Sequence, residues 1–215
     1  MANVKQQLEV PSIPSLGYPP EVYERRHFNE NNSALNNFFR KLISVLSALF
    51  GPRGGKFMNN PYGAFQDTTD QTAAAANTAY AMTLNTVDYA NGVSVASNSR
   101  ITVADAGIWN LQWSGQFQNT DTQIHDARIW LKINGTVVTG STGFISVPNR
   151  HGGVDGHSIF GWNYFLSLNA NSYVELWWET DNTAVSIQAY AASGNYPSTA
   201  SVIATMSFVS NLPTI

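Results

Sequence analysis

The chain has 215 residues, of which 43% are hydrophobic and only 12% are charged, and its formal net charge is −3. This length suffices for one sizeable domain with an appendage, and the lack of cysteine excludes disulfides, thiolate nucleophiles and cysteine-ligated zinc. The N-terminus has no apolar signal-peptide core and no apolar run is long enough to span a bilayer, so we expect neither a secretion signal nor a membrane partner.

The charges are unevenly divided along the chain. Residues 1–60 contain seven Lys or Arg and four Asp or Glu, whereas residues 61–215 contain four and ten. An acidic body has no electrostatic reason to bind nucleic acid, and the basic segment is too thinly charged for a nucleic-acid tail. We therefore expect no nucleic-acid partner. The low overall charge suggests that other protein chains cover much of the surface.

Residues 1–32 are predicted to be an extended docking arm. Their four prolines forbid a continuous helix and favour a polyproline-like path. A disordered tail is the alternative, but such tails contain fewer aliphatic and aromatic residues. The arm residues expected to bind a partner are Leu8, Ile13, Leu16, Tyr18, Val22 and Tyr23.

Residues 33–50 are predicted to form a helix, which Asn31, Asn32 or Ser33 caps and Gly51-Pro52 ends. Two adjacent apolar rows suit a helix with neighbours on two sides, as in a three-helix assembly or a socket in a partner. An amphipathic membrane helix is the competing interpretation, although only two cations support it. The first row is Leu35, Phe38, Leu42, Val45 and Leu49, and the second is Phe39, Ile43, Leu46 and Phe50.

A linker rich in Gly, Pro and Asn over residues 51–61 precedes a region, 62–215, whose pattern is all β. Short alternating runs separated by turn signals predict a mainly β chain, an antiparallel jelly-roll sandwich preceded by the arm and the helix. Asn134-Gly135 is the strongest hairpin signal. The expected strands are 62–68, 81–87, 92–96, 99–104, 107–118, 127–133, 136–146, 157–168, 172–180, 184–190 and 200–210.

Several segments of this region resemble the C1q/tumour-necrosis-factor-like jelly-roll superfamily. Gly107-Ile108-Trp109 lies where that family has glycine, an apolar residue and an aromatic, and Ile129–Gly135 resembles its Asn-Gly hairpin. Leu166–Leu176 resembles a further family segment, but Asn171-Ser172 replaces the usual Gly-Asp. Ala64-Phe65 and Ser201–Phe208 resemble the opening and closing strands. The resemblance implies a homotrimer of jelly rolls around a three-fold axis.

The layout as a whole resembles structural proteins of tailed bacteriophages, which similarly join a proline-punctuated segment and a short helix to a trimeric β head. In this chain the corresponding segment runs from Pro19 to Leu42. This resemblance implies a virion protein that is assembled in the host cytoplasm, with the major capsid protein or another virion protein as its partner.

The candidate chemistry is sparse. His151, Asp155 and His157 are residue types that bind metals, but a polar glycine-rich loop is the simpler interpretation, and we predict no metal and no cofactor. His125-Asp126 and the calcium candidates Asp121, Asp126 and Asp155 lack an established motif.

Glu175 and Glu179 lie four residues apart on one strand face, about 13 Å, which is too far for glycosidase chemistry. The chain contains no nucleophile-elbow, zinc-protease or P-loop motif, so we predict no enzymatic activity. Trp109 and Trp113 share a strand face with Leu111 and are expected in the core or an interface. Trp177 and Trp178 face opposite sides, so we expect one of them in the core and the other at an interface or a ligand.

The sequence thus favours a trimeric capsid decoration (cement) protein that its N-terminal arm anchors. The alternative is a short tail fibre or receptor-binding protein whose head binds host-surface glycans through distal loops such as 149–158 and 191–198.

Overall fold

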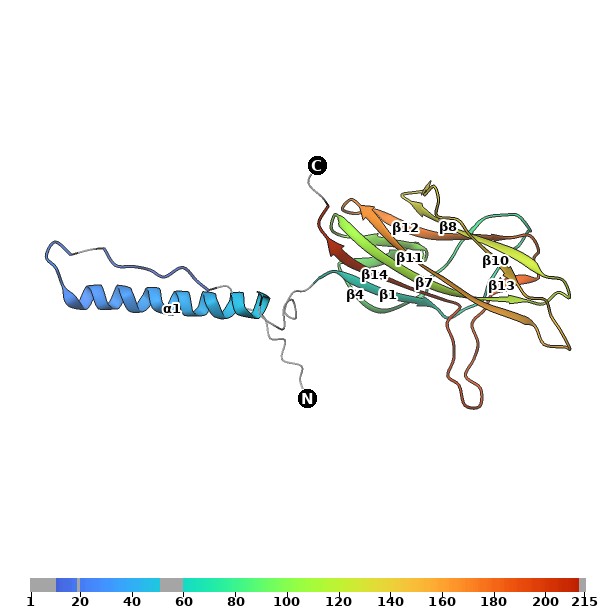
Figure 1. Ribbon diagram of the computed structural model, residues 1–215, viewed down its shortest axis with the longest axis horizontal. Coiled ribbons are helices and arrows are strands. Elements are labelled where there is room, and N and C mark those ends of the chain that lie inside the picture. The colour runs from blue at the N-terminus through green and yellow to red at the C-terminus, as the bar shows by residue number, and fades with distance from the viewer. Residues whose placement is uncertain (1–10, 19, 51–59, 213–215) are drawn as a thin grey trace. The chain divides into compact units, whose positions relative to one another are not determined.

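The computed structural model describes residues 11–18, 20–50 and 60–212 and divides into two units (Figure 1). The first unit, residues 1–59, contains helix α1 (Arg25–Phe50), and the second, residues 60–215, contains every strand of the described residues. The prediction of a mainly β protein with one N-terminal helix is confirmed. We call the second unit the head.

Helix α1 begins eight residues before the predicted start, so residues 25–32 belong to the helix and not to the arm. The rings of Tyr23 and Phe28 lie 6.4 Å apart on either side of the first turn, as in a hydrophobic staple. Arg26 and Glu30 form an ion pair one turn apart at 2.8 Å. Asn31 and Asn32, which were expected to cap the helix, lie inside it instead. The two contacts outweigh the small loss of helix stability that asparagine causes at interior positions. In the described part of the chain no helix is long and apolar enough to cross a bilayer.

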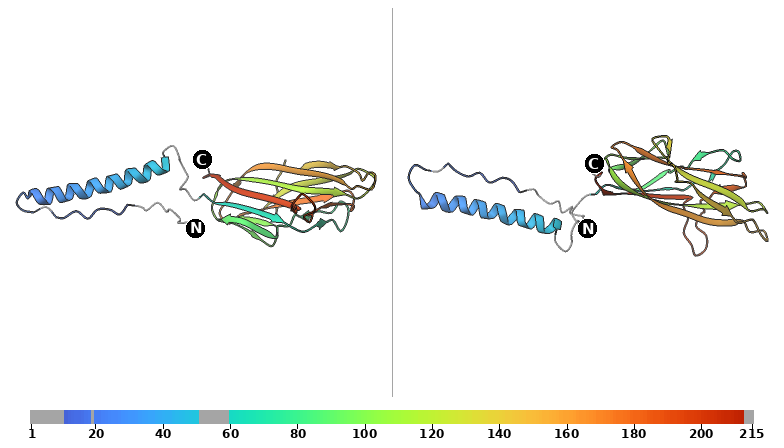
Figure 2. Two further views of the ribbon diagram at one scale, coloured as in Figure 1. Left: turned by 90° about the horizontal axis from the view of Figure 1, so that it is seen from below. Right: turned by 45° about the horizontal axis from the view of Figure 1, so that its top comes forward.

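The head consists of two antiparallel sheets, which we call sheet A and sheet B (Figure 2). Sheet A contains β1 (Tyr62–Asp67), β2 (Gln71–Thr72), β4 (Thr86–Asn91), β7 (Gly107–Asn119), β11 (Gly156–Leu168), β13 (Val185–Ile187) and β14 (Val202–Ser210). Sheet B contains β3 (Tyr80–Ala81), β5 (Val93–Ala96), β6 (Arg100–Val103), β8 (His125–Ile133), β9 (Thr136–Val137), β10 (Gly143–Val147) and β12 (Tyr173–Thr180).

The strand order is that of a jelly roll. In sheet A, β11 pairs along one edge of β7, while β14 and β13 pair along the other, and β14 continues to β1 and β4. In sheet B the order is β10, β8, β12, β6 and β5. The chain moves repeatedly from one sheet to the other, so strands that are distant in sequence become neighbours and the two sheets enclose one core.

Strand β7 is the centre of that core. Its alternate residues Trp109, Leu111, Trp113 and Phe117 are all buried, which confirms that Trp109 and Trp113 face inward. The ring of Phe117 contacts that of Trp178 from sheet B, with 6.2 Å between centroids. This aromatic contact joins the two sheets, and Trp178 is therefore the core member of the adjacent tryptophan pair.

Three predicted strands differ clearly from the structure, and of the strand predicted over 184–190 only β13 is present. Residues 82–85 are not a strand, although buried Met82 and Leu84 alternate with less buried neighbours. The chain passes here from sheet B to sheet A, and the Met82 and Leu84 N–H groups donate to the carbonyl oxygens of Leu176 and Asn98, which belong to different segments. The predicted strand 136–146 divides into β9 and β10 where Gly140 takes a positive φ of 80°. Asn134 and Gly135, with φ of 50° and 81°, form the predicted hairpin turn.

The start of β11 provides a test of this packing. A Cβ on Gly156 would lie 1.7 Å from the carbonyl oxygen of Pro148, a backbone atom that cannot swing aside as the end of a flexible side chain can. We expect Gly156→Ala to lower the free energy of unfolding by about 3 kcal/mol or more in urea denaturation. Ser158→Ala on the same strand is the control, and we expect a much smaller change. Equal stability of the two variants would contradict the packing described here.

Candidate interaction surfaces

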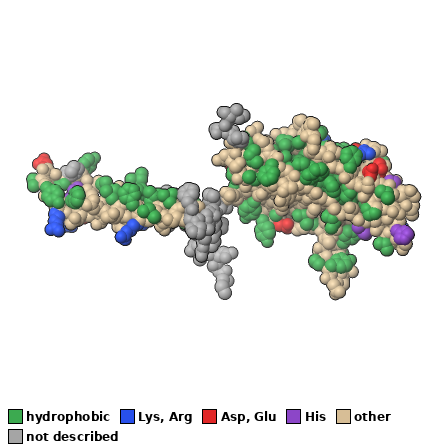
Figure 3. Space-filling model, in the orientation of Figure 1, with side chains coloured by type: hydrophobic (Ala, Val, Ile, Leu, Met, Phe, Trp, Pro, Cys, Tyr) green, Lys and Arg blue, Asp and Glu red, His purple; other side chains and the backbone are tan. Residues whose placement is uncertain are grey.

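The outer face of sheet A carries almost no charge. The side chains of β7 that point away from the core are Ile108, Asn110, Gln112, Ser114, Gln116 and Gln118. They are flanked by Ile159 and Phe165 of β11 and by Ile203 of β14, which are 73%, 67% and 47% exposed. Apolar and uncharged polar side chains cover most of the head face seen in Figure 3. The seven strands of sheet A contain only Asp67, which is buried, and Asp88 as carboxylates, and neither Lys nor Arg.

The outer face of sheet B is, by contrast, lined with charges. Arg128 and Glu179 form an ion pair at 2.7 Å, and Arg100 lies 3.5 Å from the buried carboxylate of Glu175. The ammonium group of Lys132 lies 3.3 Å from the centre of the Trp177 ring. Trp177 is therefore the outward-facing partner of Trp178, as expected. Sheet B thus presents charged side chains, whereas sheet A presents uncharged polar side chains and exposed apolar ones.

A long loop projects from the head between β13 and β14 (Figure 1). Backbone bridges at Tyr190–Thr199 and Ser193–Tyr196 hold it as a narrow hairpin, and it contains no charged residue. Tyr190 Oη lies 3.1 Å from His157 Nδ1, at the side of a hollow of about 460 Å³ that Ile159 and Tyr196 also line. Burial, followed by the carboxylates of Asp155 and Asp70, raises the pKa of the Tyr190 hydroxyl, so the phenol stays protonated at neutral pH. The hairpin therefore adds further uncharged surface beside sheet A.

The two apolar rows of α1 differ in exposure. The row of Leu35, Phe38, Leu42, Val45 and Leu49 is partly buried. In the second row, Phe39, Ile43 and Leu46 are exposed, from 42% for Leu46 to 61% for Ile43. The side chain of Phe50 lies outside the described residues. Among the described residues, the second row is thus the more exposed face of the helix.

The described part of the arm passes beside α1. A Cβ on Gly17 would lie 2.9 Å from the His27 ring, so the arm and the start of the helix are close together. Residues 11–18 form neither helix nor strand. The predicted arm residues Ile13, Leu16, Tyr18, Val22 and Tyr23 are exposed, and Leu8 lies outside the described residues.

The weak metal candidates do not converge on one point. His151 lies at an exposed turn, where its backbone pairs with that of Val154. The Asp155 carboxylate accepts a hydrogen bond from Gln118 and lies 3.3 Å from the guanidinium of Arg150. His157 instead contacts Tyr190. Within residues 11–18, 20–50 and 60–212, no three His, Asp or Glu side chains are arranged to hold a metal ion.

The remaining acidic candidates are engaged in separate polar contacts. His125 lies between Asp121 and Asp181, at 3.0 and 3.3 Å, and not against the neighbouring Asp126. The hydrogen bond from His125, with the Thr122 backbone N–H, lowers the pKa of the Asp121 carboxyl. Glu175 and Glu179 each lie against an arginine, Arg100 and Arg128 respectively.

Two features escaped the sequence reasoning, although the sequence contained a signal for both. The low charge was noted for the whole chain, but the predicted strands 107–118, 157–168 and 200–210 contain no Asp, Glu, Lys or Arg at all. The alternation in Arg128-Ile-Trp-Leu-Lys132 places Arg128, Trp130 and Lys132 on one face, which the structure shows to be the outer one. The sequence does not reveal that β8 pairs with β12, and this pairing places Glu179 beside Arg128, Trp130 and Lys132.

Comparison with known proteins does not extend this description, since neither a scan of protein-family models nor a search of curated proteins finds a match to the chain.

The row that includes Leu42 tests whether the two units fold independently. We expect Leu42→Asp to disturb the packing around α1, because an unpaired carboxylate on a partly buried site costs several kcal/mol. The near-ultraviolet circular dichroism of the tryptophans should not change, since all six lie in the head. Ser44→Asp, on an exposed position of α1, is the control. Loss of the tryptophan signal in Leu42→Asp alone would show that helix and head are one cooperative unit.

Proposed function

We propose that this chain is a non-enzymatic structural protein of a phage virion. Three copies of the head associate through the outer faces of their A sheets, and the N-terminal unit attaches the trimer to the capsid as a decoration protein. The chain is made in the host cytoplasm and resides in the virion. The number of copies and the phage setting rest on the resemblances described for the sequence.

The observation that carries this proposal is the contrast between the two sheets. A sheet face without Lys, Arg or exposed carboxylates near its centre can be buried against another copy without desolvating a full charge, provided that its amides and hydroxyls find hydrogen-bond partners there. The exposed apolar side chains Ile159, Phe165 and Ile203 are already partly buried, and complete burial would contribute about 1–2 kcal/mol each. The charged face of sheet B would remain in water, so its ion pairs would not have to be desolvated.

The N-terminal unit supports the second half of the proposal. Its exposed apolar side chains are too numerous for a segment that serves only as a spacer, and they lie in a unit separate from the head. An extended segment with prolines and apolar residues can order along a partner surface at a lower entropic cost than a flexible one.

A short tail fibre is the second candidate function, and the group around Trp130 on sheet B is the observation that favours it. The number of copies in a purified virion discriminates between the two. A number on the scale of the capsid lattice supports a decoration protein, whereas a few trimers support a tail fibre.

A matched pair of phenylalanines tests the proposed interface. Phe165 on sheet A and Phe144 on sheet B are both 67% exposed in the single chain. We expect Phe165→Glu to sediment as a monomer of 23.5 kDa, because the interface would bury an unpaired carboxylate, whereas Phe144→Glu remains a trimer. Sedimentation velocity at micromolar concentration gives both masses. Trimeric Phe165→Glu would contradict the assignment of the interface to sheet A.

Truncation tests the role of the arm. We expect a chain lacking residues 1–24, which retains α1 and the head, to form trimers but to lose co-sedimentation with purified virions. The fragment 60–215 is the comparison, and it should behave in the same way if the arm alone is the anchor. If the chain without residues 1–24 binds virions as well as the full chain, the arm does not anchor the protein.

A further inference from the structure

The outer face of sheet B contains a hollow, and Trp130 is one of the residues that line it. The hollow measures about 340 Å³ and is lined by Arg128, Trp130 and Lys132 of β8, Glu179 of β12, Val137 of β9 and Thr142. The three β8 residues alternate with Ile129 and Leu131, which point into the core, so strand geometry holds all three on the same side. This volume lies near the lower end of the range for small-molecule sites, about 300–1,000 Å³.

The side chains around Trp130 are fixed by their own contacts. Arg128 and Glu179 hold each other at 2.7 Å, and the Arg128 guanidinium also lies 5.7 Å from the centre of the Phe144 ring. Lys132 lies over Trp177, the cross-strand partner of Trp130, and thereby covers that second ring. Trp130, a partly buried side chain, is the tryptophan that lines the hollow, and it lies among polar groups that are already oriented before a ligand arrives.

The charges of the hollow favour a negatively charged ligand. Arg128 is neutralised by Glu179, whereas Lys132 forms no ion pair within the described residues. Among the side chains that line the hollow, Lys132 thus carries the one positive charge without a carboxylate partner, and it lies on the same strand face as Trp130. A ligand that combines an apolar ring face with a carboxylate satisfies both features.

We propose that this hollow binds a short glycan with a carboxylate-bearing sugar ring. The C–H face of a pyranose stacks on Trp130, its carboxylate pairs with Lys132, and its hydroxyls donate to Glu179 and exchange hydrogen bonds with Thr142. A second protein surface fits less well, because its docking would desolvate the Arg128–Glu179 pair without replacing its hydrogen bonds. Small ligands that leave this pair at the rim avoid that cost.

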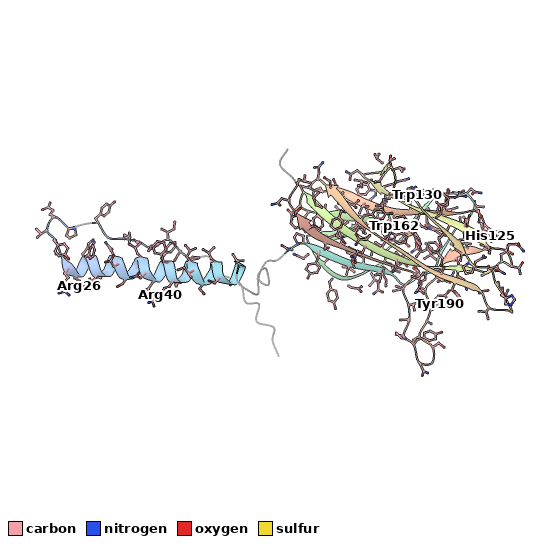
Figure 4. All side chains as sticks on the ribbon, viewed as in Figure 1. Arg26, Arg40, His125, Trp130, Trp162 and Tyr190 are labelled. Atoms are coloured by element: carbon pink, nitrogen blue, oxygen red, sulfur yellow. The ribbon has the colours of Figure 1, made fainter. Side chains whose placement is uncertain are left out.

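This site does not depend on the assembly proposed above. It lies on sheet B, and Figure 4 shows Trp130 on the opposite side of the head from Tyr190 and the projecting hairpin. A single head contains every group that the site uses. Glycan binding can therefore fail while the trimer is confirmed, and the reverse can also occur.

The test begins with the full chain on an array of neutral oligosaccharides and of oligosaccharides ending in uronic or sialic acid. We expect binding to members of the acidic set. Titration calorimetry with the best monovalent ligand then measures affinity per chain, which does not depend on oligomeric state. We expect Trp130→Ala to weaken binding about tenfold or more, since tryptophan anchors commonly dominate binding energy. Lys132→Gln should instead remove the preference for acidic over neutral sugars.

Trp162→Ala is the matched control, since Trp162 is an exposed tryptophan on β11 that does not line the hollow. It should bind as the unmodified chain does, and near-ultraviolet circular dichroism should show that all three variants are folded. No binding to any acidic glycan on the array would overturn the proposal. Binding that survives Trp130→Ala or keeps its acidic preference in Lys132→Gln would overturn it as well.

Discussion

The alternation of side chains along β7, β11 and β14 is the constraint on which the rest of the molecule depends. Because successive residues of a strand point to opposite faces, each of these strands is divided into a buried row and an outer row. The buried row supplies Trp109, Trp113 and Met206 to the core, and the outer row supplies amides, hydroxyls and a few aliphatic groups. Both rows lack charge, so sheet A is suited to burial on its two faces, as is usual for an interior layer of an assembly.

Sheet B follows the same alternation with a different outer row. Its outward side chains form cation–carboxylate and cation–aromatic pairs across neighbouring strands, at Arg128–Glu179, Arg100–Tyr173 and Lys132–Trp177. Pairs of this kind are worth little to stability when exposed, but they hold long side chains in fixed positions. The two faces of one sandwich thus suit two tasks: contact between copies on sheet A and recognition of a small ligand on sheet B.

Most of the head could be predicted from its sequence, because turn residues and a period of two mark strands without knowledge of their partners. One error arose at Met82 and Leu84, whose alternating burial resembles that of a strand. Another arose at Tyr23 and Phe28, whose contact outweighs the low helix propensity of the residues before the predicted helix. The surfaces were harder to predict, since their character is set by pairing across strands. Nothing local in the sequence shows that Glu179 lies beside Arg128, or that His125 faces Asp181 instead of Asp126.

The most direct test of the central claim compares the solvent reactivity of Phe165 and Phe144 in the unmodified chain. Both rings are 67% exposed in a single copy, so they should react equally with hydroxyl radicals in a monomer. If copies associate through sheet A, mass spectrometry after radical labelling at micromolar concentration will show Phe165 protected and Phe144 fully reactive. Equal labelling of the two rings, or protection of Phe144 instead, would contradict the account.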